Sequence, residues 1–336
     1  MNYLVTGGAG FIGLNFILKL FNKGHELVII DKLSYASNQE IVSLISNNRG
    51  CYFYKADLFD SSAIDEIFAK HKPNRVIHFA AESHVDNSIS NPIDFINSNI
   101  IGTFNLLQSS LSMINKGLVQ KNDFIFHHIS TDEVYGDLGL TDDPFTEKSN
   151  YRPSSPYAAS KASSDHLVRS WGRTYDLPVN ISNCSNNYGP FQHIEKLIPK
   201  AINCLINHKR FPLYGSGNQI RDWIFVEDHV DAILAVLSSN VSNETFNIGA
   251  NNERTNRDVL ENLCLIFNDI CSKYGLKVFE SADFIEEVPD RPGHDFRYAI
   301  SNTKIESNLK WTPKISFEEG LLKTIIWYLD RYKTRG

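Results

Sequence analysis

Short apolar runs alternate with longer stretches of helical periodicity through the first 185 residues. Apolar and β-prone residues gather at 3–6, 27–30, 51–54, 75–79, 124–129 and 179–181, and these runs are predicted as strands. Between them, apolar residues recur every three or four positions, which predicts helices at about 11–20, 60–68, 94–113 and 157–175. Because strands that alternate with helices favour right-handed crossovers, we expect an α/β fold with a doubly wound parallel sheet.

The alternation weakens beyond residue 185, where six prolines between 190 and 313 interrupt the pattern. We therefore expect a first domain at 1–185, to which the chain returns at about 222–240, and a smaller α+β domain at 186–336. The sequence contains no internal repeat, low-complexity tract or flexible linker. The two parts are expected to pack closely.

Composition narrows the class of protein. With 336 residues, 42% of them hydrophobic and 21% charged, the chain is typical of a globular protein of two domains, or one domain with a large annex. The net charge of -6 and the lack of a Lys/Arg block argue against a nucleic-acid or membrane partner. An anionic small molecule remains possible, since a few basic residues and a helix N-terminus suffice to bind it.

The cysteines and the N-terminus indicate the compartment. The five cysteines form an odd set without a Cys-x-x-Cys motif, which favours free thiols over disulfides or a zinc site. The chain starts with a strand rather than a signal peptide, and no apolar run approaches the length of a membrane span. We expect a cytoplasmic protein with no metal site.

A glycine-rich turn follows the first predicted strand. In Gly7-Gly8-Ala9-Gly10-Phe11-Ile12-Gly13, the dinucleotide fingerprint fits in two registers, with glycines at 7, 10 and 13 or at 8, 10 and 13. The next strand ends at Asp31, whose carboxylate is placed to accept hydrogen bonds from ribose hydroxyls and to repel a 2′-phosphate. NAD is therefore favoured over NADP, although the neighbouring cation Lys32 could tolerate a phosphate.

Polar residues of three kinds follow the strand at 124–129. Thr131-Asp132-Glu133 places a hydroxyl and two carboxylates at a strand end, where open α/β sheets bind ligands. Tyr157 and Lys161 share a face of the next helix and could reach the same crevice. Lys161, together with a nicotinamide cation, would lower the pKa of the Tyr157 phenol. The set indicates acid/base chemistry in several proton steps; alternatively, the two carboxylates only start a surface turn.

These motifs resemble a known superfamily. Thr6-Gly7-x-x-Gly10-x-x-Gly13 together with Tyr157-x-x-x-Lys161 is similar to the extended short-chain dehydrogenases/reductases, which implies a Rossmann-type fold. More narrowly, the chain resembles the dTDP-glucose 4,6-dehydratase family from about residue 2 to residue 330. The Asp-Glu pair is the specific part, because epimerases and simple reductases of the superfamily usually lack it. The stretches that carry the narrower resemblance are 31–33, 78–86, 127–136, 183–190, 195–199, 219–223 and 290–295.

The resemblance implies a role for each polar residue of the strand end. Tyr157 would take the C4 hydroxyl proton of a nucleotide hexose while NAD takes the hydride. Glu133 would remove the C5 proton and Asp132 would protonate the departing C6 hydroxyl, so the pKa of Asp132 should be raised. Thr131 would hold the C4 oxygen, and Lys161 would bind the nicotinamide ribose. The product would be dTDP-4-keto-6-deoxyglucose, which feeds deoxysugar and polysaccharide (O-antigen) biosynthesis.

The resemblance also implies which residues contact the ligands. NAD contacts are expected at Gly7, Gly10, Phe11, Ile12, Gly13, Asp31, Lys32, Leu33, Ser34, Asp57, Leu58, Phe79, Ala80, Ala81, Ser83, Ser98, Tyr157, Lys161 and Asn187. Substrate contacts are expected at Ser83, His84, Thr131, Asn186, Lys196, Leu197, Pro212, Tyr214, Arg221, Asn256, Arg291 and His294. The two arginines suit bidentate phosphate binding. His127 and His128 are expected to be structural, with one pointing inward and one outward.

Several alternatives stay open at this point. The substrate could be a UDP-hexose, or the enzyme could be a nucleotide-sugar 4-epimerase or decarboxylase. A non-catalytic protein that senses NAD is a third possibility. The stretch between Gly136 and Pro156 is shorter than in many relatives, which leaves the sugar preference open. The resemblance implies a homodimer that forms through the helices at 94–113 and 157–175.

Overall fold

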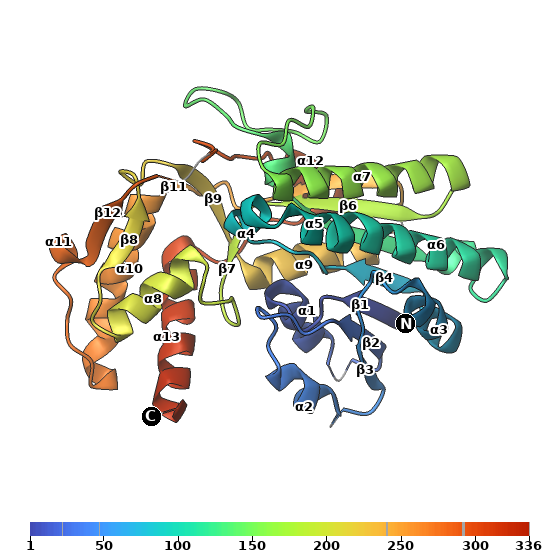
Figure 1. Cartoon of the computed structure of the whole chain (residues 1–336), viewed down its shortest axis with the longest axis horizontal. Helices are drawn as coiled ribbons and strands as arrows, with labels where there is room; N and C mark the ends of the chain where they lie inside the picture. The colour runs from blue at the N-terminus through green and yellow to red at the C-terminus, as the bar shows by residue number, and fades with distance from the viewer. Residues whose placement is uncertain (22, 47, 240, 291–292, 336) are drawn as a thin grey trace.

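The computed structural model describes residues 1–21, 23–46, 48–239, 241–290 and 293–335. A seven-stranded parallel sheet dominates the N-terminal part, in the order β10-β6-β5-β4-β1-β2-β3 (Figure 1). The predicted doubly wound α/β fold is confirmed. Its strands are β1 (Asn2–Thr6), β2 (Glu26–Asp31), β3 (Cys51–Lys55), β4 (Arg75–His78), β5 (Ile125–Thr131), β6 (Val179–Cys184) and β10 (Glu244–Ile248).

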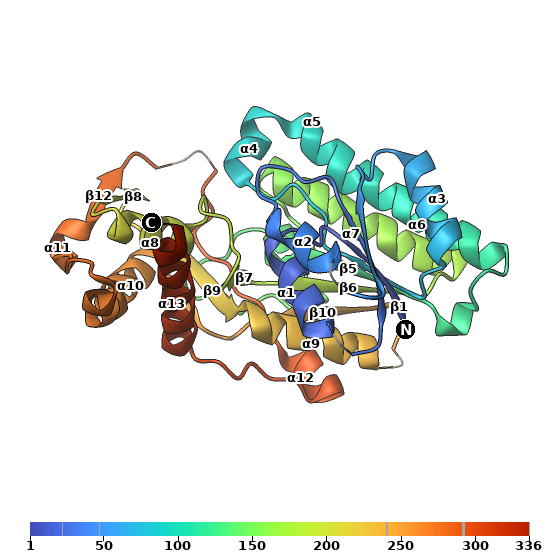
Figure 2. The same ribbon diagram turned by 90° about the horizontal axis from the view of Figure 1, so that it is seen from below.

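Helices cover both faces of this sheet (Figure 2). Alternate residues of β1 explain why two cores form, since Tyr3 and Val5 join one apolar cluster and Leu4 joins the other. One face carries α1 (Phe11–Leu20), α2 (Glu40–Ser46) and α9 (Val226–Ser238). The opposite face carries α3 (Ser61–His71), α6 (Gly102–Asn115) and α7 (Pro156–Tyr175).

The helix predicted at 94–113 is built from three consecutive pieces. These are α5 (Pro92–Phe95), the π-helix η1 (Ile96–Ile101) and α6, and the short α4 (Val85–Ser90) precedes them. Asn99 in the π-helix donates to the carbonyl of Glu82 and accepts from its amide, at 3.0 and 2.8 Å. The wide turn thereby fixes the loop that follows β4. Asp60 caps α3, because its side chain accepts from the Ala63 amide.

The expectation that one of His127 and His128 points outward is wrong. Both side chains are fully buried, because β5 lies inside the sheet and helices cover both of its faces. His127 contacts the Ser182 hydroxyl at 3.1 Å, whereas His128 faces α7. Burial lowers the pKa of His127 to about 3 and that of His128 to about 4.

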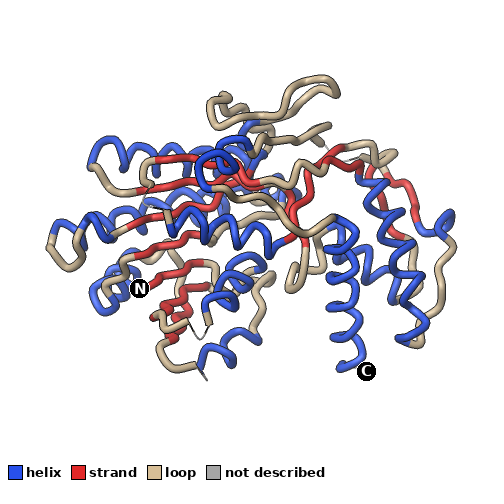
Figure 3. The backbone as a smooth tube through the Cα atoms, turned by 180° about the vertical axis from the view of Figure 1, so that it is seen from behind, coloured by secondary structure: helices blue, strands red, loops and turns tan. Residues whose placement is uncertain are grey.

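The C-terminal part packs around a core of its own beside the main sheet (Figure 3). The strand β10 returns to the edge of the main sheet after α9; the sequence did not predict it, because Glu244 and Asn247 interrupt its apolar pattern. Two small sheets, β11-β9-β7 and β12-β8, complete this part. Its strands are β7 (Asn186–Tyr188), β8 (Phe211–Tyr214), β9 (Ile220–Phe225), β11 (Glu253–Thr255) and β12 (Ile285–Val288). Its helices are α8 (Leu197–Ile206), α10 (Asn256–Ile270), α11 (Ser281–Phe284), α12 (Thr303–Leu309) and α13 (Phe317–Arg335).

Short 3-10 turns link some of these elements: η2 (Lys121–Asp123), η3 (Asp132–Tyr135) and η4 (Cys271–Tyr274). None of the helices among the described residues combines the length and the apolar character that crossing a bilayer requires.

Candidate active site

The glycine-rich turn lies between β1 and α1, and two of its glycines are sterically required. Gly7 has a φ of +66°, and a Cβ there would lie 2.6 Å from the Ala80 amide nitrogen. A Cβ on Gly13 would lie 2.3 Å from the Gly7 carbonyl oxygen, so the helix could not approach the turn. Gly7, Gly10 and Gly13 line the cavity described below, whereas Gly8 packs against Ile17 and Ile29.

Asp31 ends β2 beside this turn. One carboxylate oxygen accepts from the Ala9 amide at 2.9 Å, and the other accepts from the Leu33 amide at 2.8 Å and the Ser37 hydroxyl at 3.0 Å. These three donors hold the negative charge at the cavity wall. The ammonium of Lys32 lies 2.6 Å from the Glu82 carboxylate, so its charge is matched by a neighbouring anion.

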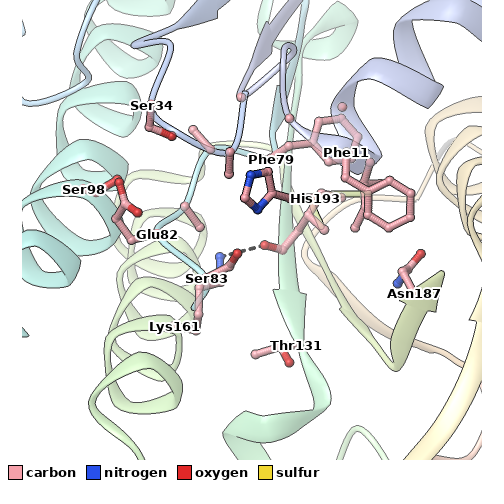
Figure 4. Close-up of a pocket in the computed structure, with 18 of the residues that line it drawn as sticks. Phe11, Ser34, Phe79, Glu82, Ser83, Ser98, Thr131, Lys161, Asn187 and His193 are labelled. Carbon is pink, nitrogen blue, oxygen red and sulfur yellow. Dashed lines mark hydrogen bonds between the residues drawn. The ribbon is translucent and has the colours of Figure 1, made fainter. Parts of the chain in front are cut away.

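A cavity of about 310 Å³ extends from the glycine turn to the ends of β5 and β6. Figure 4 shows Ser34 and Ser98 on one side of it, Phe11 and Asn187 on the opposite side, and Thr131 and Lys161 at its far end. All the predicted NAD contacts except Leu33 line it, and so do the predicted substrate contacts Ser83, Thr131, Asn186 and Lys196. The five predicted acid/base residues, Thr131, Asp132, Glu133, Tyr157 and Lys161, line it together.

Thr131 is the last residue of β5, and the 3-10 turn η3 begins at Asp132. The Thr131 hydroxyl caps the turn by accepting from the Glu133 amide, and it donates to the Asp132 carboxylate, both at 3.3 Å. Asp132 is 2% exposed, and its second oxygen has no hydrogen-bond partner among the described residues. Burial, and after it the charge of Glu133, raise the pKa of Asp132 well above that of a free carboxyl. The raised pKa that we expected for Asp132 is therefore present.

Tyr157 and Lys161 lie one turn apart on α7, which Ser155 caps and Pro156 begins. Lys161 donates to the Ile129 carbonyl at 2.7 Å, and burial lowers its pKa to about 8. Burial, and after it the Glu133 carboxylate, raise the pKa of Tyr157 well above that of a free phenol, while a hydrogen bond with Thr131 lowers it. In the protein alone, burial thus outweighs the lowering of the Tyr157 pKa that we expected from Lys161.

Cys184 ends β6 directly beside Thr131 and also lines the cavity. Burial raises the pKa of its thiol to about 12, so the group stays protonated and is a poor nucleophile. The described residues contain no cluster of His, Cys, Asp or Glu side chains that could hold a metal ion.

Some predicted substrate contacts lie outside this cavity, and Arg291 lies outside the described residues. Those that the structure describes but does not place on the cavity wall are His84, Leu197, Pro212, Tyr214, Arg221, Asn256 and His294. Arg221 on β9 nevertheless belongs to the same region, because its charge lowers the pKa of Asp132. Its guanidinium lies 4.3 Å from the centre of the Tyr298 ring and donates to the Asp295 carbonyl.

The cavity also includes residues that we did not predict. Glu82 and Glu195 lie inside stretches that carry the family resemblance; Glu82 pairs with Lys32, and Glu195 accepts from the Tyr35 hydroxyl. The available signal was a charged residue next to a predicted contact, Ser83 for Glu82 and Lys196 for Glu195. The remaining unpredicted wall residues are Ile30, Ala36, Ser37, Ala56, Ile129, Ser130, Cys184, Ser185, Gln192 and His193.

Comparison with known proteins places this geometry in a family. The family model described as GDP-mannose 4,6 dehydratase matches residues 4–324. The dTDP-glucose 4,6-dehydratase of Haemophilus influenzae is 49% identical over 331 residues, which covers 98% of each chain. The structure of DesIV, a dTDP-glucose 4,6-dehydratase from Streptomyces venezuelae solved with NAD and TYD bound, is 36% identical over 99% of this chain and 98% of its own, with a TM-score of 0.87.

The wider fold is shared with other enzymes of nucleotide sugars. The UDP-glucose 4-epimerase of Thermotoga maritima, solved with UDP-glucose, is 30% identical over the whole of both chains, with a TM-score of 0.86. Fold alone therefore does not separate dehydration from epimerisation. The higher identity to the dehydratases, together with the Thr-Asp-Glu sequence at the end of β5, does separate them, and the chain belongs to the dTDP-glucose 4,6-dehydratase family.

Proposed function

We propose that this protein is a hydro-lyase that converts dTDP-glucose to dTDP-4-keto-6-deoxyglucose with tightly bound NAD. The observation that carries the proposal is the pair Asp132 and Glu133 beside Tyr157, in one cavity with the glycine-rich turn. Elimination of water needs a proton donor and a proton acceptor on the same substrate. A buried carboxyl with a raised pKa next to a second carboxylate supplies both.

The residues near the glycine turn fit NAD. The first turn of α1 presents free backbone amides, and a Cβ on Gly13 would fill the space that the close turn needs. Asp31 faces the cavity with its charge held by three donors. When bound there, NAD would take up a hydride from the sugar and return it within the same turnover.

The chain's own residues move the protons. Tyr157 accepts the proton of the C4 hydroxyl while Thr131 holds the C4 oxygen. The resulting C4 ketone acidifies the C5 proton, which Glu133 removes. Asp132, whose pKa burial raises well above that of a free carboxyl, donates a proton to the C6 hydroxyl, and the hydroxyl leaves as water. A proton then returns to C5, and Lys161 holds the nicotinamide ribose throughout.

The division of labour along the chain is part of the proposal. Residues 1–185, with the return at about 222–240, would form the NAD-binding Rossmann domain, and 186–336 would bind the nucleotide sugar. The described contacts expected for the nucleotide gather around β8 and β9. There Asp290 accepts from Gln219 at 2.9 Å and contacts His294 at 2.7 Å, and the His294 ring lies 6.4 Å from that of Tyr214.

A panel of nucleotide hexoses tests the function directly. The purified protein with NAD should convert dTDP-glucose to a product lighter by one water in mass spectrometry. Asp132→Asn is the matched control, since it keeps the shape of the side chain and removes its acid. An epimerase would give a product of unchanged mass, and a stronger reaction of UDP-glucose or UDP-N-acetylglucosamine would reassign the nucleobase.

We also propose a homodimer through α5, α6 and α7. This surface exposes apolar side chains that a monomer would leave in water: Ile93 is 54% exposed, Ile96 43% and Phe104 37%. Phe104 and Trp171 pair edge to face at 5.8 Å and tie α6 to α7. The two helices lie side by side in Figure 2. Light scattering should give twice the chain mass for the native protein, and Phe104→Glu should give the mass of one chain.

The cytoplasm is the proposed location. All five cysteines are free thiols, four of them buried, which suits a reducing compartment.

A further inference from the structure

Asp165 is a fully buried carboxylate that the proposed chemistry does not use. It lies on α7, one turn beyond Lys161, on the face that also carries Tyr157. One of its oxygens accepts from the Ser130 hydroxyl at 2.9 Å, the Tyr151 hydroxyl at 2.7 Å and the Asn183 amide at 3.3 Å. Burial raises the pKa of this carboxyl, but its contact with His128 and the positive charges of Lys161 and Arg169 outweigh burial and hold the Asp165 pKa below its usual range.

The other oxygen of Asp165 faces the imidazole of His128. The distance from this oxygen to Nε2 of His128 is 3.3 Å, and the same Nε2 lies 3.3 Å from Nζ of Lys161. A single ring nitrogen can donate to the carboxylate or accept from the ammonium, but it cannot do both. The imidazole therefore lies between a buried anion and a buried cation, within a region that water does not reach.

We propose that Asp165 is a positioning residue that keeps the Lys161 side chain charged and fixed, with the neutral imidazole of His128 as the spacer between them. In this arrangement Nε2 of His128 carries the proton and faces the Asp165 carboxylate, while the Ile129 carbonyl accepts from the ammonium. Nδ1, which has no hydrogen-bond partner among the described residues, stays unprotonated. The inference rests on the proposed role of Lys161 in binding NAD. It assigns a function to a carboxylate that touches neither ligand.

The other groups around Lys161 do not supply a compensating charge. His128 on β5 is neutral at physiological pH, because burial lowers its pKa to about 4. Cys184 on β6 is protonated, and His78 on β4, whose ring lies 5.1 Å from that of His128, is also neutral because burial lowers its pKa. Tyr157 on α7 is protonated, and Arg169, one turn past Asp165, adds a positive charge.

The sign of the effect follows from these charges. Burial lowers the pKa of Lys161 to about 8, and the Asp165 carboxylate acts against this lowering. Without that carboxylate, Lys161 would lose its proton at a lower pH. If only charged Lys161 holds the ribose, then NAD affinity should fall above pH 8 in the native protein. In Asp165→Asn the same fall should begin about one pH unit lower.

Calorimetry of NAD binding to the stripped full-length protein tests this at two pH values. Relative to the native protein, Asp165→Asn should bind NAD about fivefold more weakly at pH 8, and within about twofold as tightly at pH 6. The matched control is Tyr151→Phe, which removes one donor to Asp165 but keeps the carboxylate. Its pH dependence should match that of the native protein, and the alkaline limb of kcat should shift only in Asp165→Asn.

The outcomes separate this inference from the proposed function. An equal loss of NAD affinity at both pH values would mean that Asp165 only supports the fold, and would overturn the inference. Failure of the native protein to bind NAD would overturn the proposed function instead. If Asp165→Asn does not fold, nitrogen NMR of histidine-labelled native protein decides: a proton on Nε2 of His128 supports the inference, and a proton on Nδ1 overturns it.

Discussion

The Lys32 ammonium lies 2.6 Å from the Glu82 carboxylate in the wall of the candidate cofactor cavity. Both residues line the cavity, and Glu82 is held there because Asn99 binds its backbone amide and carbonyl. The pair answers a question that the sequence left open. Lys32 follows Asp31 and could have offered its positive charge to a 2′-phosphate. Its ammonium instead forms an ion pair with the Glu82 carboxylate.

Glu82→Gln is expected to relax the preference for NAD. Freeing Lys32 should strengthen NADP binding about three- to tenfold, a modest gain because the pair is partly exposed to solvent, while NAD affinity stays close to native. Calorimetry with both cofactors measures this. Glu195→Gln removes a carboxylate from the same cavity without freeing Lys32 and should leave NADP binding weak. If the double variant Glu82→Gln, Lys32→Ala keeps the gain in NADP affinity, Lys32 is not the residue that binds the 2′-phosphate.

Substitutions of the acid/base residues should block different steps of the reaction. Tyr157→Phe should block the first oxidation, so no reduced cofactor forms. Asp132→Asn and Glu133→Gln should allow oxidation but block elimination, which leaves reduced cofactor without product. Each loss in turnover should be about a hundredfold or more, as is usual for a positioned acid or base. Absorbance of the reduced cofactor, followed beside product mass, distinguishes these outcomes; near-native turnover of all three variants would contradict the assignment.

Arg221→Lys is expected to weaken substrate binding without affecting NAD. The Arg221 side chain is 5% exposed, stacks on Tyr298 and donates to three backbone carbonyls, so its guanidinium is rigidly placed. A lysine cannot reproduce the planar set of donors. Binding of dTDP should weaken about ten- to hundredfold, measured by calorimetry with NAD as the internal control. Unchanged dTDP affinity would mean that the diphosphate lies elsewhere.

Stability should fall steeply when the pH drops below 6.5. Burial lowers the pKa of His127 and His229 to about 3 and that of His128 to about 4, so the unfolded chain binds protons that the folded chain does not. Stability from these groups is present above 6.5 and is lost as the pH falls. At pH 5.5 each of the three histidines should lower the free energy of unfolding by about 1.4 kcal/mol. The raised pKa values of the buried carboxyls Asp132 and Asp222 act in the opposite direction.

Urea unfolding at pH 7.5 and pH 5.5 measures this loss. His127→Gln should reduce the difference between the two pH values by about 1.4 kcal/mol, because one buried titrating ring is gone. His166→Gln, at an exposed position of α7, is the control and should leave the difference unchanged. An equal response of the two variants would assign the acid sensitivity to other groups.

Much of this protein is determined by local sequence. Short apolar runs that alternate with amphipathic stretches can pack only as a parallel sheet with helices on both faces, so the fold class was predictable. The glycines at 7 and 13 indicate a close approach of helix and strand, because a side chain at either position would clash. Thr131 and the two carboxylates after it follow a strand, and strand ends of such sheets meet at one edge.

Tertiary structure decided what depends on partners distant in sequence. The burial of both His127 and His128 depends on β5 lying inside the sheet, which no local pattern reveals. The neutralisation of Lys32 by Glu82 joins residues 50 positions apart, and the contact of His128 with Asp165 joins β5 to α7. Local sequence determines which residues can ionise, whereas the packing around them determines which charges face each other away from water, and that sets their pKa values.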